Sequence, residues 1–365
     1  MDKPTAATAT SNPSEHVIGI DLGDRYSHVC VLDRGRGEVV EAFRFKTTRE
    51  GLKGAFAARS SATVALEVSG HSRWVSVELA GMGHDVVVAN PGALKIIYAS
   101  RRKNDTNDAE KLARLARHDV KLLSPVTHRD EVAQHVRTII KARDCLVRSR
   151  TMQINSFRGM VKAHGDRVPT CSARSFAKTA AAWLASDDID EPLRFALEPV
   201  LTTIAEATRL IIWYDKQISR LVDEVMPEAQ AVKQVHGVGE LTAAAFVSTL
   251  GDPSRFARSR DVAAYFGLVP RQEQSGRIDR QLGITKTGDR LVRRLLVQCA
   301  QYILGHFGRD SDLRRWGLRL AERGGKSAKK RAVVAVARKL AVLLHRLMVS
   351  GEVYEPIGYG KAAAA

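Results

Sequence analysis

The N-terminal third of the chain alternates between short β-branched runs and amphipathic stretches, and this order restricts the fold more than any other feature. Three strand-like runs follow one another directly, and helix-like and strand-like segments then alternate. The strand-like runs are Val17–Gly23, Tyr26–Asp33, Gly37–Phe45, Thr63–Val68 and Asp85–Ala89. The helix-like segments are Thr48–Arg59, Arg73–Met82 and Asp105–Arg117. This order predicts an α/β layer domain over residues 16–124.

The rest of the chain is helical in character, and we expect two further domains, at 125–226 and 227–356, with disordered tails at 1–15 and 357–365. Nine positions spaced four and three residues apart indicate a coiled coil with two polar intrusions. They are Leu197, Leu201, Ile204, Thr208, Ile211, Asp215, Ile218, Val222 and Val225. A patchier stripe on Glu131–Val161, interrupted by Arg143 and Arg150, is the candidate partner. Two interpretations stay open: an ordinary amphipathic helix pair, or a coiled coil that also mediates oligomerisation.

Charge is in excess and unevenly distributed. Lys and Arg number 57 against 40 Asp and Glu, a formal net charge of +17. From Glu228 to the end there are 24 basic and 12 acidic residues, so +12 of the +17 lies in the last third. Such an excess points to a polyanionic partner, a nucleic acid or an acidic membrane surface.

Several classes of protein are excluded. The four cysteines form no CxxC pair, which argues against a zinc ribbon or a disulfide framework and favours a reducing compartment. No apolar run approaches the roughly 18 residues of a membrane span, and the polar N-terminus lacks a signal-peptide core. We therefore expect a cytoplasmic protein with no membrane partner.

Four carboxylates form the first candidate site. Asp21 and Glu67 stand at the ends of apolar strands, and Asp105 and Asp108 are three residues apart, so they share one face of a helix. Together they would repel one another unless a cation neutralised them, and oxygen ligands of this kind suit one or two Mg²⁺ ions in phosphoryl chemistry. Each acid alone is more simply a cap or a surface charge. A sugar-kinase-like phosphate loop at Gly19–Asp24 competes, but no second phosphate loop follows.

The C-terminal region offers candidate phosphate contacts. Gly237 and Gly239 precede an Ala-rich helix, which is similar to a helix-hairpin-helix turn that grips phosphates through backbone N–H groups, although a plain tight turn explains them too. Ser275 lies in a polar, irregular segment among cations that would hold a phosphodiester while the hydroxyl attacks it. Most serines in such surroundings are ordinary turn residues. The surrounding cations are Arg271, Arg277, Arg280, Lys286, Arg290, Arg293 and Arg294, and a later basic helix adds Lys329, Lys330 and Arg331.

These residues carry a family resemblance over residues 16 to 356. The chain resembles insertion-sequence transposases of the one-ten/eleven-eleven type, the bridge-RNA-guided DEDD/serine recombinases. The resemblance lies in the order of the acids Asp21, Glu67, Asp105 and Asp108, in the helical spacer, and in the blocks VHGVG, FGLVPRQEQSG and ITKTGDRLVRRLL. Many relatives have Ser-Ser-Gly-Gly or Ser-Thr-Gly-Gly where this chain has Gln274–Arg277. Ser275 is the serine available there. Asp24 is an alternative to Asp21, which fits the strand end better.

The resemblance implies a RuvC-like domain of RNase H fold with Mg²⁺ at the four acids, a coiled coil, and a mainly helical transposase domain whose serine is Ser275. It also implies strand exchange between donor and target DNA through phosphoserine links, guided by a bridge RNA. The working assembly would be a homotetramer, a dimer of dimers, with active sites shared between protomers. Two alternatives stay open: a Mg²⁺-dependent nuclease that uses water, with Ser275 structural, and a non-enzymatic nucleic-acid-binding relative. The basic C-terminal third and the Arg-interrupted helix Arg137–Arg158 suit a backbone-bound guide RNA.

Overall fold

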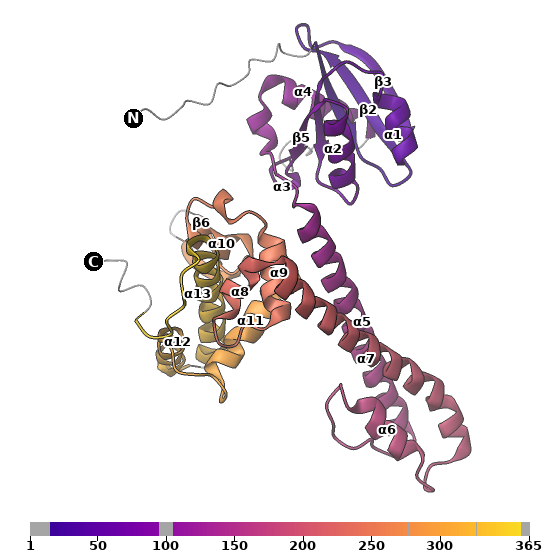
Figure 1. The fold of residues 1–365 in the computed structure, drawn as a ribbon, viewed down its shortest axis with the longest axis vertical. Helices are drawn as coiled ribbons and strands as arrows, with labels where there is room; N and C mark the ends of the chain where they lie inside the picture. The colour runs from indigo at the N-terminus through magenta and orange to yellow at the C-terminus, as the bar shows by residue number, and fades with distance from the viewer. Residues whose placement is uncertain (1–14, 95–104, 276–277, 326, 359–365) are drawn as a thin grey trace. The chain divides into compact units, whose positions relative to one another are not determined.

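A computed structural model describes residues 15–94, 105–275, 278–325 and 327–358. The chain forms two compact units, Met1–His128 and Arg129–Ala365. Figure 1 shows a sheet with its helices in the first unit and a predominantly helical second unit. The fold is thus mixed α/β, with a mostly helical remainder. The domain boundaries after residues 124 and 226 stay predictions.

The first unit is built on one five-stranded sheet in the order β3-β2-β1-β4-β5. The strands are β1 (His16–Asp21), β2 (Tyr26–Asp33), β3 (Val39–Lys46), β4 (Thr63–Glu67) and β5 (Asp85–Ala89). The first three form an antiparallel meander, and β4 and β5 run parallel to β1. All five predicted strands are confirmed, with end shifts of a few residues at β1, β3 and β4.

Helices cover both faces of this sheet. On one face, α1 (Arg49–Phe56) and α2 (Ser72–Gly81) close a core that includes Ile18 and Ile20. On the other, α4 (Asp105–His118) packs on the intervening side chains, such as Ala65. The short α3 (Pro91–Leu94) and a 3₁₀ turn at Val120–Leu123 complete the described part of the unit. Alternate residues of β1 and β4 therefore belong to opposite layers, as the two-residue period of a strand requires.

The second unit begins with two long helices, α5 (Glu131–Ala163) and α7 (Glu191–Val225), with the short α6 (Phe176–Leu184) between them. The pair is antiparallel. Arg143 Nε donates to Asp215 Oδ1 at 2.5 Å, and Arg150 Nη1 donates to the Thr208 hydroxyl at 3.3 Å. The two arginines that interrupt the stripe of α5 thus meet the two polar residues that interrupt the series of α7.

The apolar series on α7 is largely buried in this pair. Leu197, Ile204 and Val222 are fully buried, whereas Asp215 and Val225 are exposed. An antiparallel pair within one chain accounts for this burial, since the apolar positions of α7 face α5 and α6. Supercoiling of the pair and oligomerisation through it stay predictions.

The remaining chain folds around a buried central helix. The body consists of α8 (Pro227–Lys233), α9 (Glu240–Leu250), α10 (Ser259–Tyr265), α11 (Arg290–Leu304), α12 (Asp312–Glu322) and α13 (Ala328–Ser350). Every residue of α9 from Thr242 to Leu250 is buried, because its small alanines let neighbouring helices approach closely. The helices predicted at Ala-rich and basic amphipathic segments are confirmed.

One local prediction was wrong. The segment 271–290 was expected to be irregular, but β6 (Pro270–Ser275) and β7 (Ile278–Ile284) form an antiparallel hairpin. β6 is polar from Arg271 to Ser275, so it lacks the apolar alternation by which a sequence reveals a strand. β7 has apolar residues at alternate positions, Ile278, Leu282 and Ile284, a strand signal that went unrecognised beside its polar partner.

Residues 1–14 and 359–365, where the tails were predicted, lie outside the described residues. Within the residues that the structure describes, no helix is both long and apolar enough to cross a membrane.

Candidate active site and nucleic-acid interface

Asp21 and Glu67 end neighbouring parallel strands and face the same side of the sheet. The register pairs Gly19 with Ala65 and Ile20 with Leu66, so the next positions along both strands bring Asp21 beside Glu67. Ala65, two residues before Glu67, packs beneath α4. Because side chains alternate between faces, both carboxylates lie on the α4 side of the sheet, at the carboxyl ends of β1 and β4.

A glycine in β1 brings α4 against this edge. A Cβ atom at Gly19 would lie 2.0 Å from the carbonyl oxygen of Ala109 and 2.6 Å from the amide nitrogen of Ala113, distances that only a residue without a Cβ permits. Asp108 directly precedes Ala109 in α4. The close crossing at Gly19 therefore sets the N-terminal part of α4, with its partial positive charge, next to the acidic edge.

The carboxylates act on one another electrostatically. Burial raises the pKa of Glu67 above its ordinary value, and the charges of Asp21 and Asp108 raise it further. Asp108 is in turn paired with Lys111, whose Nζ lies 2.8 Å from Asp108 Oδ1. Three of the four predicted acids are thus brought together at one edge of the sheet.

Asp105 begins α4, and its side chain lies outside the described residues. Within the described chain, no three His, Cys, Asp or Glu side chains are close enough to enclose a metal ion. The donors nevertheless fit a hard divalent cation, because carboxylate oxygens are its preferred ligands. Burial and then the neighbouring charges of Asp21 and Asp108 raise the pKa of Glu67, and a cation would offset that cost of ionisation. The acidic edge is therefore a candidate site for a divalent metal.

The alternative acid, Asp24, is placed differently. Its side chain is 96% exposed in the β1–β2 turn, with Oδ1 3.7 Å from His71 Nε2. Asp21 instead faces α4 and influences Glu67. This difference in burial favours Asp21 over Asp24 as the partner of Glu67.

Ser275 stands at the end of the polar hairpin. It is the last residue of β6 and pairs with Ile278 of β7; residues 276–277, which include Arg277, lie outside the described residues. Ser275 is exposed, as are Arg271 and Arg280 on the same hairpin. The exposed position of Ser275 leaves its hydroxyl accessible to a large substrate such as DNA.

The other predicted cations divide into two groups. Lys286 and Arg290 are exposed between the hairpin and α11, and Lys329, Lys330 and Arg331 are exposed on the first turn of α13. Arg293 and Arg294 have partners within the protein instead. Arg293 Nη1 donates to the carbonyl oxygens of Phe266 at 3.1 Å and Thr287 at 2.5 Å, and Arg294 forms an ion pair with Asp144. Arg293 thereby holds α11 against the turn that follows α10.

The glycine turn between α8 and α9 has the backbone that its sequence suggested. Gly237 has φ +98°, and a Cβ there would lie 3.0 Å from the ring of Tyr302. Gly239 precedes the first residue of α9, is exposed, and no side chain caps the helix. The first N–H groups of α9 are the ones that a helix leaves without backbone partners. This turn therefore offers backbone N–H groups that can donate hydrogen bonds to a phosphate.

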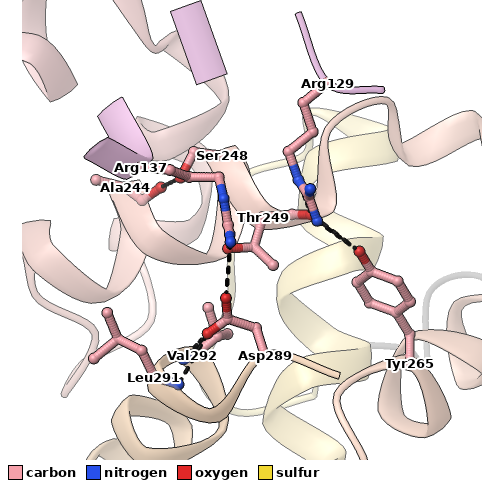
Figure 2. Close-up of polar contacts among 9 residues, drawn as sticks. All are labelled: Arg129, Arg137, Ala244, Ser248, Thr249, Tyr265, Asp289, Leu291 and Val292. Atoms are coloured by element: carbon pink, nitrogen blue, oxygen red, sulfur yellow. Dashed lines mark hydrogen bonds and ion pairs between the residues drawn. The ribbon is translucent and has the colours of Figure 1, made fainter. Parts of the chain in front are cut away.

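A polar network that sequence reasoning missed ties α5 to the start of α11 (Figure 2). Arg137 Nη2 lies 2.9 Å from Asp289 Oδ2, while Asp289 Oδ1 accepts from the amides of Leu291 and Val292 at 2.9 and 3.1 Å. Burial opposes ionisation of Asp289, but the Val292 amide and Arg137 outweigh it and hold its pKa below the ordinary value. Nearby, Arg129 Nη2 donates to the Tyr265 hydroxyl at 2.9 Å.

This network also corrects the interpretation of the Arg-rich helix. Arg137, Arg143 and Arg150 were counted toward a nucleic-acid surface on α5, but each contacts a polar side chain of its own chain. Arg148 pairs with Asp144 at 3.1 Å too, but its side chain stays 68% exposed. A signal was present in the sequence: Arg137 and Arg143 fall at helical spacing among apolar residues, the position of a buried or bridging cation. Their partners are 152 and 72 residues away, which no local pattern reveals.

Carboxylates suited to a divalent cation and a basic second unit are features of enzymes that cut and rejoin DNA, and comparisons with known proteins establish this class. A transposase model named for the DEDD motif of IS110 matches residues 18–165, and the model described as the transposase IS116/IS110/IS902 family matches residues 229–314. The transposase for insertion sequence element IS1111A of Coxiella burnetii is 31% identical over 342 residues, 93% of this chain and 91% of the relative. The chain therefore belongs to the IS116/IS110/IS902 family of insertion-sequence transposases.

Two other relatives extend the comparison. A probable family 20 transposase of Pseudomonas aeruginosa is 27% identical over 93% of this chain and 98% of its own length. A pilin gene-inverting protein of Moraxella bovis is 29% identical over 138 residues, 37% of this chain and 42% of its own. The first relative is named as a transposase and the second as a protein that inverts a gene, so both are consistent with DNA recombination.

Proposed function

We propose that this transposase exchanges strands between donor and target DNA through a transient phosphoserine link at Ser275. The observation that carries the proposal is the exposed position of Ser275 at the end of β6, on a hairpin where Arg271 and Arg280 are exposed too. In the attack, a bond forms between Ser275 Oγ and phosphorus, the bond from phosphorus to one deoxyribose oxygen breaks, and that oxygen leaves with the serine proton. A strand end that reverses the step on the ester rejoins DNA without ATP.

The acidic edge would support this reaction from Asp21, Glu67, Asp105 and Asp108. A Mg²⁺ ion held there would neutralise charge on the scissile phosphate. Held in this way, the phosphate would be positioned for attack and release. The sheet order, with an antiparallel meander followed by two parallel strands, supports a RuvC-like RNase H fold for the first unit.

Guidance by a bridge RNA and assembly into a tetramer complete the proposal. The net charge of +17 and the exposed cations on the hairpin and α13 suit partners bound through their phosphates. Sequence choice would then rest on pairing between RNA and DNA. A tetramer would let the acids of one protomer act with the serine of another.

Trapping the covalent adduct tests the nucleophile. The wild-type protein, its RNA and a 5′-labelled or 3′-labelled DNA junction are mixed with Mg²⁺, denatured in SDS and separated on a gel. We expect a labelled protein band for one of the two labels, absent in Ser275→Ala and retained in the neighbouring control Gln274→Ala. Strand exchange by Ser275→Ala at the wild-type rate would refute the assignment.

The products also distinguish the competing mechanism. If the acids ran a water-dependent nuclease, the DNA would end in free 3′-hydroxyl and 5′-phosphate groups with no protein attached, and Ser275→Ala would cut normally. Asp21→Asn would abolish activity under either mechanism, so it serves as the inactive reference.

The electrostatic part of the proposal has its own measurement. RNA affinity is expected to fall by about 10³–10⁵ between about 50 and 200 mM salt if roughly 6–10 phosphates are neutralised. A flat salt response would contradict a phosphate-bound guide. Multi-angle scattering of the protein with and without RNA reports whether a tetramer forms.

A further inference from the structure

A groove on the C-terminal body has a chemistry that neither the acidic edge nor Ser275 uses. It has a volume of about 630 Å³ and lies between α12, α13 and the segment that follows α13. Ala335, Lys339, Val342 and Arg346 contribute to it at spacings of four, three and four residues, which is one face of α13. Its volume falls within the range of pockets that hold small organic groups.

Cations dominate the polar lining of this groove. Arg338 and Lys339 are exposed on α13, Arg346 follows two turns later, and Arg260 of α10 lies across from them. Asp312 is the one acidic lining residue, and its Oδ2 accepts from the Gly358 amide at 2.8 Å. The exposed cations Arg260, Arg338 and Lys339 outnumber the one carboxylate of the lining, so the groove favours an anion.

Aromatic rings supply the second component. Trp316 of α12 and Tyr354 both line the groove, and Lys339 Nζ lies 4.0 Å from the centroid of the Trp316 ring. Two backbone bonds fix the segment that carries Tyr354: its amide donates to Gln234 Oε1 at 2.8 Å, and the Asp312 amide donates to the Pro356 carbonyl at 2.8 Å. The ring wall is therefore held in place before any ligand arrives.

Cations interleaved with aromatic faces are the combination that binds single-stranded nucleic acid, because each base offers a face for stacking and each phosphate a charge. A duplex keeps its bases stacked inside and cannot use the rings, and a small inorganic anion leaves them unused. We propose that this groove binds an unpaired nucleotide of a DNA strand exposed during strand exchange, without selecting its base. DNA is the source that the family's activity supplies, and the site is independent of Ser275.

Binding of a short oligonucleotide tests the groove. The probe is a fluorescein-labelled ten-nucleotide poly-dT, titrated with full-length protein at several salt concentrations. The variant is Arg338→Gln with Lys339→Gln. The matched control is Arg319→Gln with Arg323→Gln, two exposed cations outside the lining, one on α12 and one directly after it. We expect the groove variant to bind about tenfold more weakly, with a salt slope reduced by about 1.4, and the control to change little. Equal losses in both would show bulk electrostatics and overturn the proposal.

Two further measurements test whether a base stacks on Trp316 and whether the bound strand is DNA or RNA. The oligonucleotide should quench tryptophan fluorescence, and Trp316→Phe should remove that quenching while retaining most of the affinity, because phenylalanine still stacks. Quenching that survives Trp316→Phe would place the base elsewhere. Tighter binding of a ten-nucleotide poly-U by more than tenfold would assign the groove to RNA, and tighter binding of a duplex would exclude an unpaired nucleotide. Loss of adduct formation in Ser275→Ala leaves all of these measurements unchanged, so the two proposals fail separately.

Discussion

Replacing Gly19 by alanine tests whether the close crossing of α4 over β1 builds the acidic edge. The new methyl group would lie 2.0 Å from the Ala109 carbonyl oxygen and 2.6 Å from the Ala113 nitrogen. Both are backbone atoms, so no side chain can rotate away. The helix has to retreat by about 1.5 Å to restore an ordinary van der Waals separation.

Two consequences of that retreat are measurable. Overpacking of a tight core costs about 2–3 kcal/mol, which lowers the Tm of the first unit by about 10 °C. The displacement also moves Asp108 away from Asp21 and Glu67, and a misplacement of about 1 Å costs about 100-fold in rate. We expect differential scanning calorimetry to show the first loss and a strand-cleavage assay to show the second.

The matched control is Gly54→Ala in α1 of the same unit. A Cβ at Gly54 meets nothing within 4 Å. Alanine there stabilises the helix by about 0.5 kcal/mol, because glycine in the unfolded chain has more freedom to lose. If Gly19→Ala matched this control in both Tm and cleavage rate, the close approach of α4 would not be what positions the acids.

Three further predictions concern named polar groups. The folded protein raises the pKa of Glu67, so the contribution of this group to stability is present below pH 4.5 and is lost as the pH rises through its folded pKa. Glu67→Gln should therefore raise the Tm of the metal-free protein at neutral pH. It should also abolish the Tm gain on adding Mg²⁺ and reduce activity at least about 100-fold. Arg137→Gln leaves the carboxylate of Asp289 without its cationic partner and should lower the free energy of unfolding by about 3 kcal/mol. A double-mutant cycle with Asp289→Asn, measured by urea unfolding, should give a coupling energy of about 2 kcal/mol. Additive effects of the two substitutions would show that the ion pair contributes nothing. Arg150→Met removes a buried Nε that has no hydrogen-bond partner in the part of the chain that the structure describes, and it should raise the free energy of unfolding by about 1 kcal/mol. A loss of stability would mean that the hydrogen bond from Arg150 to Thr208 outweighs the desolvation of the guanidinium.

Much of the fold could be predicted because its signals are local. The strands of the sheet are short β-branched runs, and α9, α11 and α13 show helical periodicity with recognisable ends. Asp289 precedes α11 and accepts from two of its first amides, which is the behaviour expected of an N-cap. The hairpin of β6 and β7 escaped prediction because β6 is polar after Pro270, although Ile278, Leu282 and Ile284 alternate along β7 as strand residues do.

The residues of the candidate site could be predicted from the sequence, but the contacts that position them could not. Asp21 and Glu67 attract attention as carboxylates at the ends of apolar strands, and the family resemblance implied Ser275. Nothing in the local sequence reveals that Gly19 is the point where α4 crosses the sheet, because its neighbours Ala109 and Ala113 are 90 and 94 residues further along the chain. The same holds for Arg137, whose charge suggested a surface and whose partner is Asp289.

The sequence by itself determined which segments become strands and helices, because backbone preference and apolar periodicity act over a few residues. It also determined the charge and the family. Tertiary structure alone decided which cations are exposed to a nucleic acid and which are paired within the protein. Arg290 is exposed, whereas Arg293, three residues later, donates to a backbone carbonyl of its own chain. The physical reason is that solvation and pairing of a charge depend on what the fold places beside it, often from a hundred residues away.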